Sequence, residues 1–263
     1  MTPRAFLIRG LVAGFLASFL AFAVAYTVGE PQVDAAIAVE EANAAAAPAD
    51  EPASDGHSHS HAEEDGGTEV SRQNQSTWGL LTGLVAVGTA LGGVVGLAAA
   101  FAMGRLGRLT PGQSTALVTA VGFVAFWLVP FFKYPATPPA VGSGDTIGDR
   151  TLWYFVVLAI SLVSAVGAVA LSRRLLPRFG AYRTVLASVG GYAVVVTVTA
   201  LAMPTSNELG DFPADVLWYF RLSTLFTNGV LWLGIGVILV GLIGSLHQRE
   251  SLAHARREMA ANL

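Results

Sequence analysis

Six long apolar runs constrain the fold of this chain more than any other feature of its sequence. A transmembrane helix needs about 20 consecutive apolar residues to cross a bilayer. The core of each run carries no acidic or basic side chain, and the chain as a whole is 53% hydrophobic. We therefore predict an all-α integral membrane protein with six transmembrane helices. Their approximate bounds are 5–28, 78–103, 114–132, 152–171, 184–203 and 217–245.

The first run has two interpretations. Arg4 and Arg9, the apolar stretch and Ala23-Val24-Ala25 are also typical of a signal peptide with an A-x-A cleavage site. The run is long, however, and Tyr26 and Val28 continue it. We therefore expect the helix to be retained.

The basic residues are distributed unequally between the two sides of the membrane. With the N-terminus placed in the cytoplasm, only Arg72, Lys133, Arg150 and Arg221 lie outside. Lys and Arg accumulate in cytoplasmic loops, so both termini are predicted to be cytoplasmic. Sixteen of the 18 acidic residues then fall outside, where they form an acidic face. The inner side holds eleven basic residues: Arg4, Arg9, Arg105, Arg108, Arg173, Arg174, Arg178, Arg183, Arg249, Arg256 and Arg257.

Four segments follow from this topology: a first transmembrane helix at 1–28, an outer loop at 29–77, a five-helix region at 78–246 and a cytoplasmic tail at 247–263. The outer loop begins with an alanine-rich stretch that predicts a short helix with Glu30, Asp34 and Glu41 on neighbouring turns. Its remainder reads as a flexible acidic linker.

Three histidines lie within five residues of that linker. Neutral imidazole is a good ligand for late first-row transition metals, and His57, His59 and His61 alternate with serines so that a flexible chain could wrap one ion. The alternative is a solvated linker of low complexity. We favour metal contact of modest affinity.

Two outer segments repeat a pattern. Residues 145–155 read DTIGDRTLWYF and residues 211–228 read DFPADVLWYFRLSTLFTN, so each has two acids four residues apart before Leu-Trp-Tyr-Phe. Acids in a first helical turn also complement the helix dipole, and Asp149 could pair with Arg150 or Lys133. The functional interpretation is a ring of carboxylates that concentrates cations. The aromatic residues are typical of an interface belt.

The last run carries polar groups on one helix face, and Arg221 there would repel a cation unless Asp215 neutralises it. The residues expected to form the entrance and the first part of a pathway are Glu30, Asp34, Asp145, Asp149, Asn207, Glu208, Asp211, Asp215, Arg221, Thr224 and Asn228.

Two local patterns concern structure alone. Gly88, Gly92 and Gly96 recur every four residues, which lets two helices approach closely in lipid. Thr110-Pro111 predicts an N-cap and a first-turn proline. The chain has no cysteine, no HExxH motif and no Ser/His/Asp arrangement, so we expect no enzyme activity.

Several segments resemble the CbtA-type predicted cobalt transporter subunits. They are FLIRGLVAG, GEPQVDAAIAVEEA, VPFFKYPATPPAVGSGDTIGDRT and NELGDFPADVLWYFRLSTL, and they extend from the first run to the last. The resemblance implies a cobalt permease subunit linked to cobalamin synthesis. It also implies a small CbtB-type partner with one span and a histidine motif, and a His-rich stretch after the first helix, where His57, His59 and His61 lie.

The combined expectation is a multi-pass plasma-membrane subunit of a cobalt uptake system. It would collect the dication on its acidic, His-containing outer face and pass it inward down the membrane potential. Co²⁺ or Ni²⁺ would be the transported ion, with no permanently bound cofactor. The partners would be the lipid bilayer, the CbtB-type subunit and a second copy of the chain in a homo-oligomer, with no nucleic acid. The alternative is a non-transporting scaffold or metal-sensing subunit of another permease.

Overall fold

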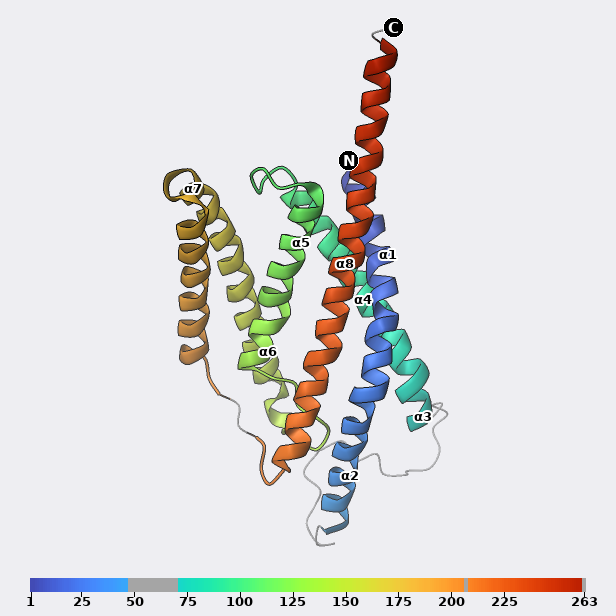
Figure 1. Ribbon diagram of the computed structural model, residues 1–263. Helices are drawn as coiled ribbons and strands as arrows, with labels where there is room; N and C mark the ends of the chain where they lie inside the picture. Colours follow the sequence, from blue (N-terminus) through green and yellow to red (C-terminus); the bar gives the residue numbers. More distant parts are fainter. Residues whose placement is uncertain (47–70, 206–207, 262–263) are drawn as a thin grey trace.

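The computed structural model describes residues 1–46, 71–205 and 208–261. These residues form an all-helical protein without strands (Figure 1). Five helical segments are long and apolar enough to cross a membrane: Pro3–Ala46, Arg72–Ala102, Pro111–Lys133, Gly144–Ala202 and Ala214–Ala261. The predicted all-α membrane class is therefore confirmed.

The first segment is one continuous rod. It comprises α1 (Pro3–Val24), a π-helical turn η1 (Ala25–Gly29) and α2 (Glu30–Ala46). The alanine-rich helix expected after the first run is confirmed as α2. The chain does not, however, leave the helix at residue 28, because π-helical pairing in η1 carries it on without a break.

The second and third segments also contain π-helical turns. The second contains α3 (Arg72–Asn74), η2 (Gln75–Gly79) and α4 (Leu80–Ala102). The third contains α5 (Pro111–Gly122), η3 (Phe123–Leu128) and α6 (Val129–Lys133). Thr110 and Gln113 form a capping box at the start of α5, with Pro111 in the first turn, which confirms the predicted helix start.

Two of the six apolar runs, 152–171 and 184–203, fall within a single element, α7 (Ile147–Ala202), which follows the short helix η4 (Gly144–Thr146). The backbone of Gly180 is not helical, with φ 71° and ψ 173°, and α7 folds back on itself there as a hairpin (Figure 1). A positive φ of this kind favours glycine. The last segment is α8 (Ala214–Ala261).

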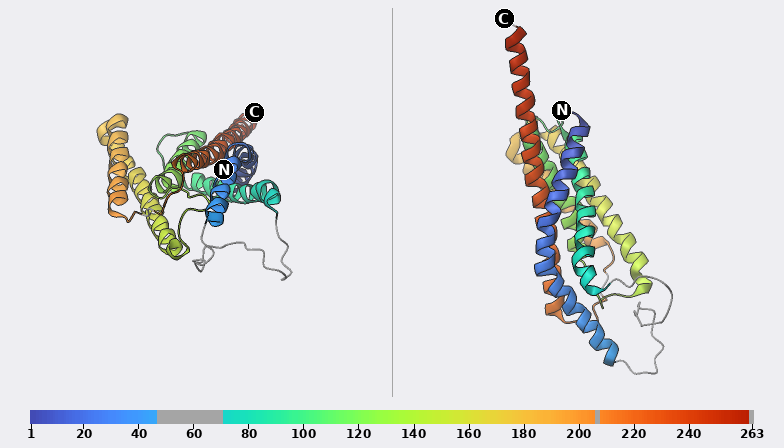
Figure 2. Two further views of the ribbon diagram at one scale, coloured as in Figure 1. Left: turned by 90° about the horizontal axis from the view of Figure 1, so that it is seen from below. Right: turned by 90° about the vertical axis from the view of Figure 1, so that its right-hand side faces the viewer.

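The connections gather at two opposite ends of the molecule (Figure 1). Both termini, the loop after α4 and the turn of the α7 hairpin lie at one end, and α2, α3 and the loops before α7 and α8 lie at the other. Which end faces the cytoplasm stays the prediction made from the distribution of basic residues. We call the end with α2 the outer end. The C-terminal part of α8 projects beyond the other helices (Figure 2).

The core lies where α1, α4 and α8 meet. Its buried side chains include Phe6 from α1, Val95 from α4 and Ile235 from α8. α1 and α4 approach so closely that a Cβ at Gly14 would lie 2.8 Å from the carbonyl carbon of Gly88. The predicted role of the glycine spacing in helix packing is therefore confirmed.

The α7 hairpin lies to one side of this core (Figure 1). Its contacts with the rest of the protein are mainly with η3, α6 and η4. The Ser161 hydroxyl donates to the Ala125 carbonyl oxygen in η3 at 2.8 Å and lies 2.8 Å from the Tyr192 hydroxyl. This polar link joins both arms of the hairpin to the third segment.

Candidate functional site

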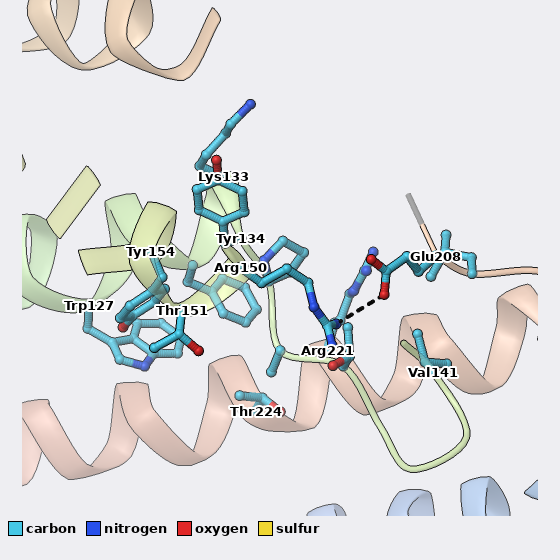
Figure 3. Close-up of a pocket in the computed structure, with 15 residues that line it drawn as sticks. Trp127, Lys133, Tyr134, Val141, Arg150, Thr151, Tyr154, Glu208, Arg221 and Thr224 are labelled. Carbon is cyan, nitrogen blue, oxygen red and sulfur yellow. Dashed lines mark ion pairs between the residues drawn. The ribbon is translucent and has the colours of Figure 1, made fainter. Parts of the chain in front are cut away.

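A cavity of about 400 Å³ lies at the outer end, between the third segment, the start of α7 and α8 (Figure 3). Trp127 and Phe131 line it from the third segment, Arg150 and Tyr154 from α7, and Arg221 from α8. We call this cavity the outer pocket. Its remaining lining residues are Lys133, Tyr134, Pro135, Ala136, Thr137, Val141, Thr151, Glu208, Leu209 and Thr224.

The loops that precede the two copies of the repeated outer pattern, 145–155 and 211–228, are joined by hydrogen bonds at the outer pocket. The Lys133 ammonium donates to the Met203 carbonyl oxygen at 2.9 Å, and the Tyr134 hydroxyl donates to the Pro204 carbonyl oxygen at 2.8 Å. The Ser143 N–H donates to the Glu208 carboxylate at 2.8 Å. These bonds hold the loop before α7 beside the loop before α8.

Arg150 is held by this loop contact. Its Nη1 lies 3.7 Å from the Glu208 carboxylate, and its Nη2 donates to the Ser143 carbonyl oxygen at 3.2 Å (Figure 3). Gly142 has a φ of 106°, and a Cβ there would lie 2.8 Å from Arg150 Nη2. The positive φ favours glycine, and any larger residue would also displace the Arg150 guanidinium. Arg150 therefore pairs with Glu208. The pair of Arg150 with Asp149, which one interpretation of the sequence expected, is not formed.

Glu208 is the one acidic side chain that lines the outer pocket among the described residues. The Thr146 hydroxyl, the Ser143 N–H and the charge of Arg150 together hold the pKa of Glu208 below its ordinary value. Each of these groups favours the charged carboxylate. Glu208 is thus ionised at neutral pH, and its charge is opposed by that of Arg150.

Arg221 lies on the α8 side of the outer pocket and has no such partner. Within the described part of the chain it makes no hydrogen bond or ion pair, and its Nε is buried. The expected ion pair with Asp215 is not formed, because Asp215 is exposed and lies six residues, about one and two-thirds turns, earlier on α8. Thr224 also lines the pocket, but its hydroxyl donates to the Phe220 carbonyl oxygen on its own helix.

The third outer arginine, Arg72, lies outside the pocket and has two carboxylate partners. Arg72 forms ion pairs with Glu30 and Asp34, the latter at 2.9 Å. Partial burial acts to lower the pKa of Arg72, but hydrogen bonds and charges from Asp34 and Glu30 outweigh it and raise that pKa above its ordinary value. This group, which we call the Arg72 triad, fastens α3 to α2. Two of the predicted entrance carboxylates are thus neutralised within the protein.

The other predicted entrance residues are spread over the outer end. Asp145, Asp149, Asp211 and Asp215 are all exposed, and no ion pair involves them within the described residues. Asn228 lies deeper in α8, and its amide donates to the Thr224 carbonyl oxygen at 3.1 Å. No group of three or more His, Asp or Glu side chains in residues 1–46, 71–205 and 208–261 is arranged to hold a metal ion. His57, His59, His61 and Asn207 lie outside the described residues.

The structure thus brings together Glu208, Arg221 and Thr224 from the predicted set and adds residues that sequence reasoning did not place in a site. The main additions are Arg150, Lys133, Tyr154 and Trp127. A signal was present in the sequence. Three of the four basic residues on the predicted outer side line this one pocket.

Comparison with known proteins gives one match. The model of the family described as probable cobalt transporter subunit (CbtA) matches residues 3–244. No curated protein matches the chain, and no solved structure matches it.

Proposed function

The chain belongs to the family of probable cobalt transporter subunits (CbtA), and on this premise we propose that it collects Co²⁺ at its outer end and passes it inward. The family match over residues 3–244 carries the proposal. That match and the five apolar helical segments make the protein a multi-pass membrane subunit in cobalt transport. The capture residues, the route and the driving force are proposed below.

In the proposed topology the chain crosses the membrane six times with both termini in the cytoplasm. The two arms of the α7 hairpin then count as separate crossings, since Gly180 reverses the chain between them. Support comes from the inner basic residues, which include Arg173, Arg174 and Arg178 beside that turn. The segment 29–77 and the loops before α7 and α8 are then outside.

Capture would begin at the outer carboxylates. Asp145, Asp149, Asp211 and Asp215 are exposed and free of ion pairs among the described residues, so their charge is open to solvent cations. Dispersed carboxylates of one sign raise the local concentration of cations without binding them in a cage. His57, His59 and His61 would add imidazole ligands for Co²⁺ or Ni²⁺ from the segment between α2 and α3.

The membrane potential is sufficient to drive uptake. One charge moving across 100 mV gains about 2.3 kcal/mol, so a dication gains about 4.6 kcal/mol when the inside is negative. That corresponds to more than about a thousandfold concentration ratio at equilibrium. We therefore propose a passive, potential-driven step without a nucleotide-hydrolysing domain in this chain.

The route through the membrane would need ligands beyond those of the described spans, whose cores lack acidic and basic side chains. A small single-span subunit with histidines, of the CbtB type, would supply them. A second copy of the chain in a homo-oligomer is the alternative source. Either partner would contact the bilayer-facing side of the helices.

The second candidate is a scaffold or metal-sensing subunit that does not itself transport. It is favoured by the lack of a three-ligand metal group among the described residues. The two candidates differ in whether cobalt crosses a membrane that contains this chain.

The experiment is uptake of radioactive Co²⁺ into proteoliposomes with an imposed potassium-diffusion potential. We expect uptake when the chain and its small partner are present and the inside is negative, and little uptake when the potential is collapsed. Uptake by neither the chain alone nor the pair would favour the scaffold. Uptake by the chain alone would show that no partner is needed.

Two sets of variants test the capture step under limiting Co²⁺. Asp145, Asp149, Asp211 and Asp215 are replaced together by Asn, and the three histidines are replaced together by Ala. We expect each set to raise the Co²⁺ concentration for half-maximal uptake severalfold. Glu258→Gln is the matched control, because Glu258 is an exposed acid at the opposite end. Unchanged uptake in both sets would contradict the proposed capture step.

A further inference from the structure

The outer pocket has a charge that suits an anion and not a metal dication. Arg150 and Arg221 line it, and Glu208 balances only one of these charges. The Lys133 side chain also lines it, but in Figure 3 its ammonium points away from Arg150 and Arg221. That ammonium donates to the Met203 carbonyl oxygen. A Co²⁺ ion in this cavity would meet two guanidinium groups and one carboxylate.

The two arginines also have unused hydrogen-bonding capacity. The Nε atoms of both Arg150 and Arg221 are buried and have no hydrogen-bond partner among the described residues. Buried polar groups in native proteins are nearly always hydrogen-bonded, so each such atom needs an explanation. A guanidinium group presents planar donors that match a carboxylate. Arg221 is the stronger candidate, because no described carboxylate pairs with it.

The walls of the outer pocket are apolar and flat. The rings of Trp127 and Phe131 stack with centroids 4.7 Å apart and an angle of 18° between their planes. Tyr134, Tyr154 and Pro135 contribute further apolar surface. A cavity of about 400 Å³ is far larger than an inorganic anion needs and lies in the range of small-molecule sites. Aromatic walls favour a ligand with a flat body.

We propose that the outer pocket binds a small organic anion, with its carboxylate at Arg221 and Arg150 and a flat body against Trp127 and Tyr154. The site is separate from the carboxylates proposed to collect the cation. A bound anion would cancel the charge of Arg221, which a cation near this mouth would otherwise meet. The proposal does not depend on cobalt transport.

The test is isothermal titration calorimetry of the purified protein in neutral detergent with three matched compounds. Benzoate carries the charge and the flat ring, benzamide carries the ring without the charge, and inorganic phosphate carries charge without the ring. We expect benzoate to bind at least tenfold more tightly than either of the others. Equal binding of benzamide would overturn the proposal. The absence of benzoate binding at concentrations up to about 10 mM would also overturn it.

Variants locate the binding in the outer pocket. Arg221→Gln should weaken benzoate binding at least tenfold, and Arg221→Lys should restore part of it because the charge returns without the planar donors. Arg72→Gln is the matched control, since Arg72 is an outer arginine that already has two carboxylate partners, and it should change binding less than twofold. An Arg221→Gln protein that elutes as folded and binds benzoate normally would refute the site.

A lipid headgroup is the competing occupant. Benzoate binding is therefore repeated in nanodiscs of neutral phosphatidylcholine and of anionic phosphatidylglycerol. We expect the same affinity in both. Loss of benzoate binding only in phosphatidylglycerol would assign the pocket to lipid phosphate and overturn the organic-anion assignment. None of these measurements contains cobalt, so a negative result here leaves the proposed transport function untouched.

Discussion

The two sides of this molecule are held together in different ways. On one side, α1 and α4 meet through glycines at backbone contact and α8 completes a core of buried apolar side chains. On the other, the α7 hairpin contacts mainly η3 and α6, and a buried serine hydroxyl supplies a polar link. The first side is thus suited to be a rigid frame. The second can shift with less loss of packing.

The outer pocket lies on the seam between these two sides. Arg221 and Thr224 belong to α8 in the frame, whereas Arg150, Thr151 and Tyr154 belong to the α7 hairpin. A small movement of the hairpin would therefore change the pocket without disturbing the glycine contacts. Ligand sites often lie at such boundaries between packed units.

A glycine substitution should have the largest effect and separate the two sides most clearly. Gly14→Ala should lower the free energy of unfolding by about 3 kcal/mol, because the new methyl group overlaps the backbone of α4. The matched control is Gly190→Ala in α7, where nothing lies within 4 Å of a Cβ. It should be neutral or stabilise by up to about 1 kcal/mol. Titration with dodecyl sulfate in mixed micelles measures both.

Equal destabilisation by the two substitutions would contradict the comparison. It would mean that α7 is packed as tightly as α1 in the membrane, against a partner subunit or a second copy. An unchanged free energy of unfolding in Gly14→Ala would instead show that α1 and α4 can move apart without loss of stability.

Much of this frame could be predicted from sequence. The four-residue spacing of Gly88, Gly92 and Gly96 has few explanations in an apolar run other than close helix contact. The partner of those glycines could not be predicted, because Gly10 and Gly14 on α1 look unremarkable beside the signal-peptide pattern. The alanine-rich helix at Glu30–Ala46 was predicted, but its continuity with the first run was not, because the π-helical turn Ala25–Gly29 that joins the two has no evident sequence signal.

The outer pocket was harder to predict than the frame. The sequence predicted a site among the acids, because carboxylates attract metal ions. In the structure Glu30 and Asp34 are paired to Arg72, and the other four aspartates of the predicted entrance are dispersed. Contacts such as Arg150 with Glu208 join residues far apart in the sequence through loop geometry. Of the pocket residues, the sequence predicted Glu208, Arg221 and Thr224 as site residues, and the small number of outer basic residues was a further signal.

The polar link of the α7 hairpin gives the next largest effect. Ser161→Ala should cost about 1 kcal/mol, because the Tyr192 hydroxyl and the Ala125 carbonyl oxygen both lose a partner. Ser172→Ala is the control, since the Ser172 hydroxyl donates only to the Val169 carbonyl oxygen on its own helix. The same unfolding titration measures both. If both variants lower the free energy of unfolding by the same amount, the polar link does not hold the hairpin.

The Arg72 triad should contribute less, because its side chains are partly exposed. Arg72→Gln should lower the free energy of unfolding by about 0.5 kcal/mol at low salt, and the difference should shrink at high salt. Unfolding at two salt concentrations checks this. Arg105→Gln is the control, since the Arg105 side chain donates to the Phe101 carbonyl oxygen, lies over the Phe101 ring and forms no ion pair among the described residues. A salt-independent loss would point to packing instead of charge.

The smallest effect should come from titrating Glu208 on the seam itself. Its pKa is lower in the folded protein than in the unfolded chain, so its contribution is complete above the ordinary Glu value of about 4.3. That contribution is lost as pH falls through the lower folded value. Tryptophan fluorescence should therefore change below about pH 4 as the Arg150 contact is released and Trp127 gains freedom.

Two variants show whether this transition belongs to the seam. In Glu208→Gln the low-pH change should be absent, because the amide carries no charge at any pH. In Asp211→Asn it should remain, because Asp211 is exposed and outside the pocket. A transition that survives Glu208→Gln would show that Glu208 does not cause it. The α7 hairpin would then be held at the seam by its apolar contacts and not by the Arg150–Glu208 pair.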